Sequence, residues 1–391
     1  MSGAVVRLTP GQHTRIRSGH PWVYRNEIAS VEGAADGGTV DVLDHAGRYL
    51  GSGYYNSASV ITVRLLTRQP EIIDAGFFAR RLQRALEHRR RLMGHASSYR
   101  LVHSEGDFLP GLIVDKFGDI LVIQTLTLGI DRWKDAIYSA LQELVSPVGI
   151  YERNDAPVRQ LEGMPERAGF LGEPFDPLVE IVEHGMKLVV DIQRGQKTGH
   201  FLDQAANRLA VAGYCRGARV LDCFCHTGGF AIQAARGGAR EVTGIDLAEP
   251  ALDVARANAM ANGVARTCSF QPGNVFDKLR SLEKQKVSYD VVILDPPAFA
   301  RSRSALPGAL RGYKEINLRG MKLVPSGGIL VSCSCSYPLD EETFIKLLVD
   351  AATDAGRQLR LLERRSPPPD HPVLPAVPES SYLKCLIMEV L

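Results

Sequence analysis

Hydrophobic and polar positions change their period along the chain, and the first change comes near residue 72. Up to that point, short runs alternate between apolar and polar positions and are separated by Gly, Asn and Asp, which predicts an all-β segment. Residues 74–94 then follow a helical period, with apolar positions three and four apart. The strands expected in the first segment are Gly38–Leu43, Gly47–Tyr55 and Ser59–Leu66, and the apolar stripe of the helix is Phe77, Phe78, Leu82, Leu86 and Leu92.

The middle of the chain, residues 73–184, mixes both periods. Strand-like runs lie at Leu112–Val114, Ile120–Gln124 and Gly149–Tyr151, and a helical pattern lies near Trp133–Val145. From about residue 185 onward, strand-length apolar runs alternate regularly with amphipathic helices. That alternation is typical of a parallel sheet covered on both faces, so we expect an α/β domain over 185–391. Its predicted strands are Arg219–Cys223, Glu241–Asp246, Ser269–Gly273, Tyr289–Asp295 and Gly328–Ser334.

Composition adds limits to this picture. The chain has 391 residues, enough for two or three domains, and its 45% hydrophobic and 23% charged residues are those of an ordinary globular protein. No run approaches the roughly 20 apolar residues that span a bilayer, and the first residues lack the apolar core of a signal peptide. We therefore expect a cytoplasmic protein without a membrane partner. Seven cysteines in such a chain do not indicate a disulfide framework.

Charge is informative only locally, because the net charge is +2. Between residues 80 and 100 stand seven arginines against one acid, Glu87. A charge run of this kind is usually a solvated helix face. The alternative is a phosphate-binding surface, since arginine contacts to phosphate supply most sequence-independent affinity for nucleic acids. The sequence leaves both interpretations open.

A cofactor site is predicted at the first strands of the α/β domain. Val220–Phe230 is a strand that enters a turn with Gly228 and Gly229, where the backbone can approach a ligand closely. The dinucleotide fingerprint G-x-G-x-x-G is missing, which disfavours an NAD enzyme. Asp246 ends the next strand, where an acid can accept hydrogen bonds from ribose hydroxyls. Its alternative role is to cap the helix that begins near Glu249.

A reaction site is predicted where the fourth and fifth strands end. Asp295-Pro296-Pro297 follows four apolar residues, and the prolines stop the strand. A turn of this kind can hold a flat, amino-bearing base, and a simple strand-ending turn is the alternative. Cys333 and Cys335 lie at the end of the fifth strand, and their spacing directs both to one side if the strand extends that far. They fit a pair of small buried side chains, a metal site shared with Cys223 and Cys225, or a nucleophile. A thiolate that adds to carbon 6 of a pyrimidine makes carbon 5 nucleophilic.

Taken together, these residues resemble the PUA-domain S-adenosylmethionine (SAM)-dependent methyltransferases that form 5-methylcytosine in 23S ribosomal RNA. The resemblance spans essentially the whole chain, and Asp191–Gln204 is its most specific part. It implies an RNA-binding PUA domain over 1–72, a central α/β-hairpin domain over 73–184 and a seven-stranded, Rossmann-like (class I) methyltransferase domain over 185–391. The other matching motifs are Arg17–Tyr24, Leu50–Asn56, Val60–Arg64 and Asp107–Asp115.

The resemblance also implies the roles of particular residues. The Phe224–Gly229 turn would hold the methionine end of SAM, Asp246 the ribose and Asn274, commonly Asp in relatives, the adenine. Asp295 would hold the cytosine and Cys335 would be the nucleophile, although the doubled cysteine leaves Cys333 open. Lys314 and Lys384 are candidates for a positive charge beside the thiolate. The full implied cofactor set is Gln196, Thr198, Phe224, Thr227, Gly228, Gly229, Asp246, Leu247, Asn274, Val275 and Asp295; the RNA-binding candidates are Arg17, Trp22, Arg80, Arg84, Arg311 and Lys314.

The predicted function is therefore methyl transfer from SAM to carbon 5 of a cytosine in 23S rRNA, free or in the assembling large subunit, without a metal. Two alternatives remain: a methyltransferase of the same fold that acts on another base atom, and a SAM-binding assembly factor without catalysis. Core packing is an equally good explanation for Trp22 and Tyr24. A homodimer is also open, because dimers are common among soluble enzymes.

Overall fold

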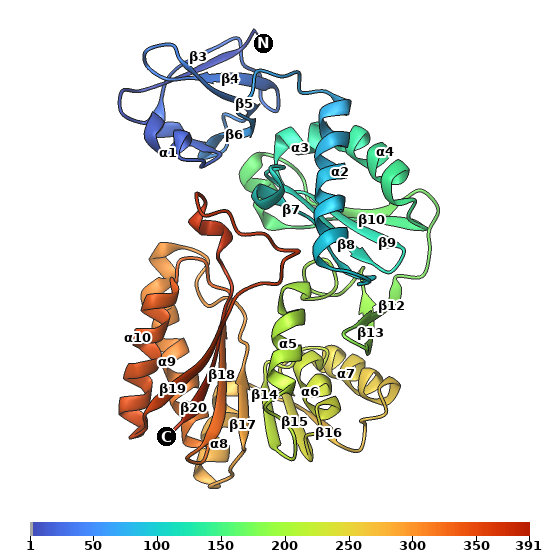
Figure 1. Cartoon of the computed structure of the whole chain (residues 1–391), viewed down its shortest axis with the longest axis vertical. Coiled ribbons are helices and arrows are strands. Elements are labelled where there is room, and N and C mark those ends of the chain that lie inside the picture. The colour runs from blue at the N-terminus through green and yellow to red at the C-terminus, as the bar shows by residue number, and fades with distance from the viewer. Residues whose placement is uncertain (1–2) are drawn as a thin grey trace. The chain divides into compact units, whose positions relative to one another are not determined.

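In the computed structural model, which describes residues 3–391, the chain forms two compact units (Figure 1). The first contains the chain up to Ile181, together with Val190–Leu202 and Pro369–Ser380. The second contains Val182–Val189, Asp203–Pro368 and Ser381–Leu391. The boundaries near residues 181–190 fall within a two-stranded hairpin, β12 (Leu178–Glu183) and β13 (Met186–Asp191). The return of residues 369–380 to the first unit has no counterpart in the sequence pattern.

The first unit begins with a six-stranded sheet in the order β2-β6-β5-β4-β1-β3, and a short helix, α1 (His13–Arg17), accompanies it. Alternate residues of its strands, such as Val6, Val40 and Val63, fill a small apolar core. The three predicted strands are confirmed with small shifts, but the shorter strands β1 to β3 were not predicted. The bounds are β1 Val5–Leu8, β2 Trp22–Tyr24, β3 Ile28–Glu32, β4 Thr39–Leu43, β5 Tyr49–Tyr55 and β6 Ile61–Thr67.

A five-stranded sheet, β11-β10-β9-β8-β7, follows in the same unit. Helix α2 (Ala75–Leu92) begins where the Asp74 side chain accepts a hydrogen bond from the Phe77 amide, and its predicted apolar stripe packs into the core of this sheet, except for Leu92, which is exposed. Figure 1 shows α2 lying across the sheet beside α4. The remaining bounds are β7 Tyr99–His103, β8 Leu112–Phe117, β9 Ile120–Thr125, α3 Leu128–Arg132, α4 Lys134–Val145, β10 Gly149–Asn154 and β11 Arg167–Leu171.

Buried polar contacts join the two sheets of the first unit. The Tyr54 hydroxyl donates to the carbonyl of Pro110 at 2.6 Å and lies 2.8 Å from the Thr127 hydroxyl. Glu162 is buried and pairs with Arg64 at 2.9 Å, while Asn56 donates to the same carboxylate at 2.9 Å. A buried charge is stable only when it is paired in this way, so the contacts hold the six-stranded sheet against the second sheet.

The second unit is built on a seven-stranded sheet in the order β16-β15-β14-β17-β18-β20-β19. All neighbours are parallel except β20, which runs antiparallel to β18 and β19. This confirms the predicted Rossmann-like fold class. The bounds are α5 Ala205–Ala212, β14 Arg219–Cys223, α6 Gly229–Arg236, β15 Glu241–Asp246, α7 Glu249–Ala261, β16 Cys268–Pro272, α8 Val275–Lys284, β17 Val291–Leu294, α9 Leu306–Lys322, β18 Gly328–Ser334, α10 Glu341–Ala355, β19 Leu359–Arg365 and β20 Lys384–Val390.

Strands β19 and β20 were not identified from the sequence pattern. Strand β19 alternates poorly, with Leu361 and Leu362 both exposed, whereas β20 is buried along almost its whole length. Strand β20 is identified only by its pairing with β18 on one side and β19 on the other. In the part of the chain that the structure describes, no helix has both the length and the apolar character needed to cross a membrane.

Candidate active site

Four parallel strands bring the predicted functional residues to one edge of the sheet. Cys223, at the end of β14, is in register with Ile245 of β15 and with Leu294 of β17, and Leu294 is in register with Ser332 of β18. The residues that follow these strands therefore emerge at the same edge. Ligands of open α/β sheets bind at the carboxyl ends of the strands, so this edge is the candidate active site.

The turn after β14 has an unusual backbone. Phe224, His226 and Gly228 all have positive φ, at 64°, 50° and 82°. Such values are uncommon for residues other than glycine, and they cluster at sites that bind ligands. A Cβ on Gly228 would lie 3.1 Å from both Ala255 Cβ and Phe270 Cζ, so a side chain there would be crowded as well as strained by its positive φ. The glycine turn that the sequence predicted is present, and the positive φ values of Phe224 and His226 add strain that the sequence did not reveal.

Asp246 connects this turn to the next strand. One carboxylate oxygen accepts a hydrogen bond from the His226 amide at 2.8 Å, and the other accepts one from the Ala248 amide at 3.0 Å. The cap residue of α7 is Ala248, so Asp246 does not cap the helix itself. Its half-exposed carboxylate keeps lone pairs available, and the neighbouring Leu247 is 74% exposed. The Asp246 carboxylate can accept hydrogen bonds from ribose hydroxyls, and the exposed Leu247 side chain beside it can pack against a flat base.

Asn274 and Val275 lie at the end of β16 and have structural roles. The Asn274 side-chain oxygen accepts a hydrogen bond from the Phe276 amide at 2.9 Å and so caps α8. Val275 is buried in the core. The predicted contact of Asn274 with adenine stays a prediction, because its amide nitrogen and one lone pair of its oxygen are not used by the cap.

Beneath the turn, Asp222 is fully buried. Burial and the nearby charge of Asp295 raise the pKa of its carboxyl well above the usual value, and the Ala231 amide donates to one of its oxygens at 2.9 Å. The other oxygen has no hydrogen-bond partner among residues 3–391. Together with the strained turn and the Asp246 carboxylate, this unpaired polar group fits a cofactor that has an amino-acid end and an adenosine end, as SAM does.

Asp295 is held by a chain of amide side chains. One of its carboxylate oxygens accepts a hydrogen bond from Gln204 at 2.9 Å, and the Gln204 oxygen in turn accepts one from Asn207 at 2.6 Å. Arg365 of β19 donates to the Asn207 oxygen at 3.0 Å. Gln204 and Asn207 are both buried. The sequence motif placed Gln204 only at the end of the Asp191–Gln204 stretch, so its contact with Asp295 was missed.

The two cysteines of the fifth strand have different surroundings. Strand β18 ends at Ser334, so the condition for Cys333 and Cys335 to face one side does not hold. Cys333 is 0% exposed and lies opposite Cys385 on β20; the hydrogen bond to that thiol and burial raise its pKa well above the usual value. Cys335 lies past the strand and is half-exposed, with its Sγ 4.0 Å from the carbonyl oxygen of Pro296.

One of the two lysine candidates lies near Cys335. Lys384 is buried at the start of β20 and donates hydrogen bonds to the carbonyls of Ser336 at 2.9 Å and Tyr382 at 2.8 Å. Burial lowers the pKa of Lys384 to about 8, and the charge of Cys335 opposes that change. Lys314 instead forms an ion pair with Asp354 at 2.8 Å, so its charge is already partnered on the surface.

Tyr313 fixes the loops that carry Asp295 and Cys335, a role that the sequence did not reveal. It is buried, and its hydroxyl lies 3.0 Å from both Ser334 Oγ and Ser336 Oγ, while Ser336 Oγ accepts a hydrogen bond from the Ala300 amide at 3.0 Å. Its ring packs 4.6 Å from that of Phe299. Tyr313 lies between two of the RNA-binding candidates, Arg311 and Lys314. Its burial excludes it from contact with RNA, whereas Arg311 is exposed.

The arginine-rich segment 80–100 does not form one surface. Arg89 is fully buried in an ion pair with Asp107, and Arg100 pairs with Asp115 at 2.8 Å. Arg80 and Arg84 are exposed on α2. Of the other RNA-binding candidates, Arg17 is exposed and pairs with Asp44 at 3.1 Å. Trp22 is half-buried and donates to Glu105 at 2.8 Å.

Gln196 and Thr198 belong to the first unit, and Thr198 donates a hydrogen bond to the buried Asp115 at 2.5 Å. Their contact with the cofactor stays a prediction. Thr227 lies in the strained turn beside Gly228 and Gly229. No group of three or more His, Cys, Asp or Glu in residues 3–391 is arranged to hold a metal ion.

A Rossmann-like sheet with an acid at the end of its second strand and a strained turn after its first defines an α/β enzyme that binds an adenosine-containing cofactor. Comparison with known families narrows the class. A family of S-adenosylmethionine-dependent methyltransferases matches residues 156–389, and a PUA-like domain matches residues 6–68. The chain therefore belongs to the SAM-dependent methyltransferase family, and SAM is its cofactor.

Individual relatives agree with this assignment. The chain is 43% identical to the ribosomal RNA large subunit methyltransferase I of Klebsiella pneumoniae and, equally, to that of Escherichia coli, over 97% of this chain and 98% of each relative. Among solved structures, SMU.776 complexed with SAH has a TM-score of 0.85 at 22% identity, with 98% of this chain and 99% of that chain covered. A SAM-dependent methyltransferase from Streptococcus mutans has the same TM-score at 21% identity and the same coverage. At these identities the solved structures confirm the fold only.

Proposed function

We propose that this enzyme transfers a methyl group from SAM to carbon 5 of a cytosine in large-subunit (23S) ribosomal RNA, through a covalent bond between Cys335 and carbon 6. The substrate class is supported by the relatives at 43% identity, which are named for methylation of large-subunit rRNA, and by the PUA-like domain. The observation that carries the chemistry is the position of Cys335, which lies half-exposed next to Pro296 at the sheet edge that also carries Asp295.

The contrast with Cys333 favours Cys335 as the nucleophile. A nucleophilic thiol must reach a base and must lose its proton, because the thiolate is the reactive form. Cys333 is buried against Cys385, where its raised pKa keeps it protonated. Cys335 is accessible and lies near the ammonium group of Lys384, whose positive charge favours a thiolate beside it. We therefore assign Lys384 the role of a positioning residue, whose positive charge stabilises the thiolate form of Cys335.

The residues of the site would act in sequence on a cytosine that has left its stack, as bases do in enzymes of this kind. The Asp295 carboxyl, oriented by Gln204, hydrogen-bonds the N3/N4 edge of the ring. The Cys335 thiolate adds to carbon 6, the electron pair of the 5,6 double bond shifts toward carbons 5 and 4 and N3, the atom that the Asp295 carboxyl would hydrogen-bond, and carbon 5 becomes an enamine carbon. Carbon 5 then forms its bond to the methyl group of SAM, while the sulfur keeps the electron pair of the broken bond and leaves as S-adenosylhomocysteine. A base removes the proton from carbon 5, the 5,6 double bond forms again and the thiolate leaves carbon 6.

When bound, SAM supplies an electrophilic methyl group to carbon 5. Asp246 would hold its ribose, Leu247 would cover the adenine, and the turn of Phe224, Thr227, Gly228 and Gly229 would hold the amino-acid end. These residues fit such a cofactor because the strained turn and the unsatisfied oxygen of Asp222 are already in place before binding. An enzyme that modifies ribosomal RNA would act in the cytoplasm.

One observation favours a second function, methyl transfer to an exocyclic amine. An acid followed by two prolines at the end of a strand holds an amino-bearing base without any need for a cysteine. The two functions differ in whether Cys335 is required. A SAM-binding assembly factor without catalysis would need neither the Asp295 carboxyl nor the Cys335 thiol.

The test is methyl transfer from labelled SAM to large-subunit rRNA that lacks this modification, with analysis of the methylated nucleoside. We expect label in 5-methylcytosine, a loss of at least about 10³-fold in kcat for Cys335→Ala, and near-normal activity for Cys333→Ala as the matched control. Label in another nucleoside, or activity that survives Cys335→Ala, would favour amine methylation. Tight SAM binding by the wild-type chain without any transfer would favour the assembly factor.

A further inference from the structure

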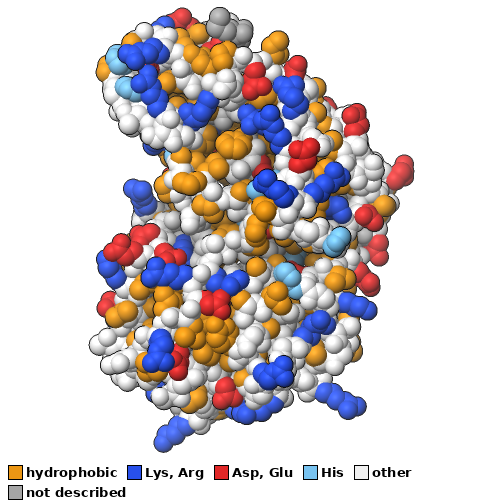
Figure 2. Space-filling view, in the orientation of Figure 1, with side chains coloured by type: hydrophobic (Ala, Val, Ile, Leu, Met, Phe, Trp, Pro, Cys, Tyr) orange, Lys and Arg blue, Asp and Glu red, His pale blue; other side chains and the backbone are white. Residues whose placement is uncertain are grey.

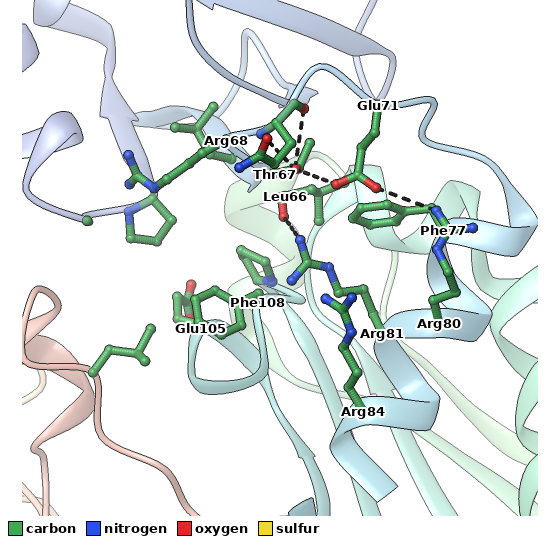
Figure 3. A pocket seen from close by; sticks show the side chains of 16 residues that line it. Leu66, Thr67, Arg68, Glu71, Phe77, Arg80, Arg81, Arg84, Glu105 and Phe108 are labelled. Atoms are coloured by element: carbon green, nitrogen blue, oxygen red, sulfur yellow. Dashed lines mark hydrogen bonds and ion pairs between the residues drawn. The ribbon is translucent and has the colours of Figure 1, made fainter. Parts of the chain in front are cut away.

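A cavity of about 470 Å³ lies within the first unit, and none of the residues that line it belongs to the proposed reaction site. Its walls come from the end of β6 and the residues after it, from α2, and from the segment that follows β7. This volume is within the range of about 300–1,000 Å³ that small-molecule sites occupy. Figure 3 shows Arg81 and Arg84 pointing from α2 toward Phe108, whereas Arg68 points away from these two arginines.

The charges in this cavity, which we call the arginine pocket, do not balance. Four arginines (Arg68, Arg80, Arg81 and Arg84) and two acids (Glu71 and Glu105) line it. Both acids are already engaged: Glu71 accepts a hydrogen bond from Thr67 at 2.6 Å and lies 3.5 Å from Arg80, while Glu105 accepts hydrogen bonds from Trp22 at 2.8 Å and Ser104 at 2.6 Å.

The other arginines form no ion pair within 4.0 Å of a carboxylate in residues 3–391, although the charge of Glu71 acts on Arg81. Arg81 donates to the carbonyl of Leu66 at 3.0 Å, and Arg68 donates to the carbonyls of Ile16 and His20. A carbonyl satisfies a donor but does not neutralise its charge. Arg84 is exposed and makes no hydrogen bond or ion pair with the other residues that line the pocket (Figure 3). Burial lowers the pKa of both Arg68 and Arg81, which indicates that these charges are costly where they are and would gain from an anion.

The pocket also presents an aromatic face. Phe108 is 52% exposed and has a positive φ of 58°, a backbone conformation that is rare for a bulky residue. The guanidinium of Arg81 lies 5.0 Å from the ring centroid of Phe77 and 5.6 Å from that of Phe108. An exposed aromatic ring beside a guanidinium plane is the kind of surface on which an unstacked nucleobase rests in single-stranded RNA complexes.

We infer that the arginine pocket binds one unpaired nucleotide of the RNA substrate, with its base on Phe108 and its phosphate near Arg84. This nucleotide is different from the cytosine proposed to be methylated. The inference rests on the proposed function in that it takes RNA as the substrate. Figure 2 shows further basic side chains over and beside α2, which would contact the backbone of the same RNA.

The test measures binding by the full chain of a fluorescent single-stranded oligouridylate of about 10 nucleotides, and of an RNA duplex of the same length, by anisotropy. For Phe108→Ala we expect about tenfold weaker binding of the single strand, the loss typical of one stacking aromatic, and unchanged binding of the duplex. Phe108→Trp should restore the single-strand affinity. Arg84→Ala should weaken binding of both RNAs.

Arg90→Ala is the matched control, because Arg90 is an exposed arginine on the same helix that does not line the pocket. The inference is overturned if Phe108→Ala binds the single strand as the wild type does, or if Arg90→Ala has the same effect as Arg84→Ala. It is also overturned if free uridine monophosphate competes with the oligouridylate at equal concentration, since the pocket would then serve a free nucleotide. These readouts do not involve methyl transfer, so they can fail or succeed independently of the proposed function.

Discussion

The carboxyl edge of the seven-stranded sheet and the arginine pocket are both rich in charged side chains, but they hold charge in opposite ways. At the sheet edge each of these carboxylates has a specific hydrogen-bond donor. Asp246 accepts hydrogen bonds from two backbone amides, and Asp295 accepts one from the Gln204 side chain. In the pocket, Arg68 and Arg81 donate hydrogen bonds to backbone carbonyls, which do not neutralise their charge. The first arrangement fixes geometry, as a reaction requires, whereas the second keeps a surplus charge for an anionic ligand.

The same contrast exists along a single helix, and it gives the largest expected effect. Arg89 is buried on α2 and pairs with Asp107, whereas Arg84 is exposed on the same helix. We expect Arg89→Met to lower the free energy of unfolding by about 3–5 kcal/mol, because it leaves Asp107 buried without its partner. Arg84→Met should change it by less than about 0.5 kcal/mol. Urea denaturation of the two variants measures the difference, and equal stabilities would contradict the structural role of Arg89.

At the sheet edge, Asp295→Ala should lower kcat for methyl transfer by about 10²–10³-fold, because a positioned group that stabilises developing charge contributes on that scale. The affinity for SAM should change little if Asp295 mainly holds the base. Single-turnover methylation and calorimetric SAM binding separate the two effects. If Asp295→Ala binds SAM weakly but has the wild-type single-turnover rate at saturating SAM, Asp295 binds the cofactor rather than the cytosine.

Lys384 allows a test by pH. Its pKa in the folded chain is about 8, below the usual 10.5, so between these values the unfolded chain holds a proton that the folded chain lacks. The cost of burying the ammonium is fully present below pH 8 and is lost as the pH rises toward 10.5. The unfolding free energy of the wild type, relative to Lys384→Met, should therefore rise by about 3 kcal/mol over this window. A difference that does not vary with pH would show that Lys384 is not buried as an ammonium.

Gln204 should have a smaller effect on the rate. We expect Gln204→Ala to lower kcat about tenfold with an unchanged KM for SAM, because Asp295 loses the donor that orients it. Gln204→Glu places a second carboxylate against Asp295, so its activity should recover as the pH falls and one carboxyl takes up a proton. If Gln204 had only a structural role, both variants would be less stable, and the activity of Gln204→Glu would not recover as the pH falls.

The smallest expected effect concerns the salt dependence of RNA binding. If Arg84 contacts a phosphate, Arg84→Ala should reduce the slope of log K against log salt concentration by about 1, equally for all RNA sequences. Arg311→Ala provides the comparison in the second unit, where Arg311 is exposed on α9. An unchanged slope for Arg84→Ala would place the phosphate contacts elsewhere on the protein.

The local sequence pattern was a good guide wherever one strand or helix could be identified by its own residues. The bounds of β14, β15 and β18 agree with the prediction, and α2 begins at the predicted place because Asp74 caps it. The pattern failed for β19 and β20, since β20 is buried on both sides by its neighbours and β19 alternates poorly. Their assignment depends on pairing between segments distant in sequence.

By itself, the sequence determined the order of the elements from β14 to β18, the glycine-containing turn after β14 and the acids at the ends of β15 and β17, because period and glycine spacing are local properties. The resemblance in sequence named Cys335 and left Cys333 open, and only the tertiary structure separated the two by burial, since the burial of Cys333 depends on Cys385 from another strand. It also separated Arg89 from Arg84, and it brought Gln204 to Asp295 and Lys384 to the loop of Cys335. A side chain's charge and reactivity are set by what surrounds it, and those surroundings come from distant parts of the chain.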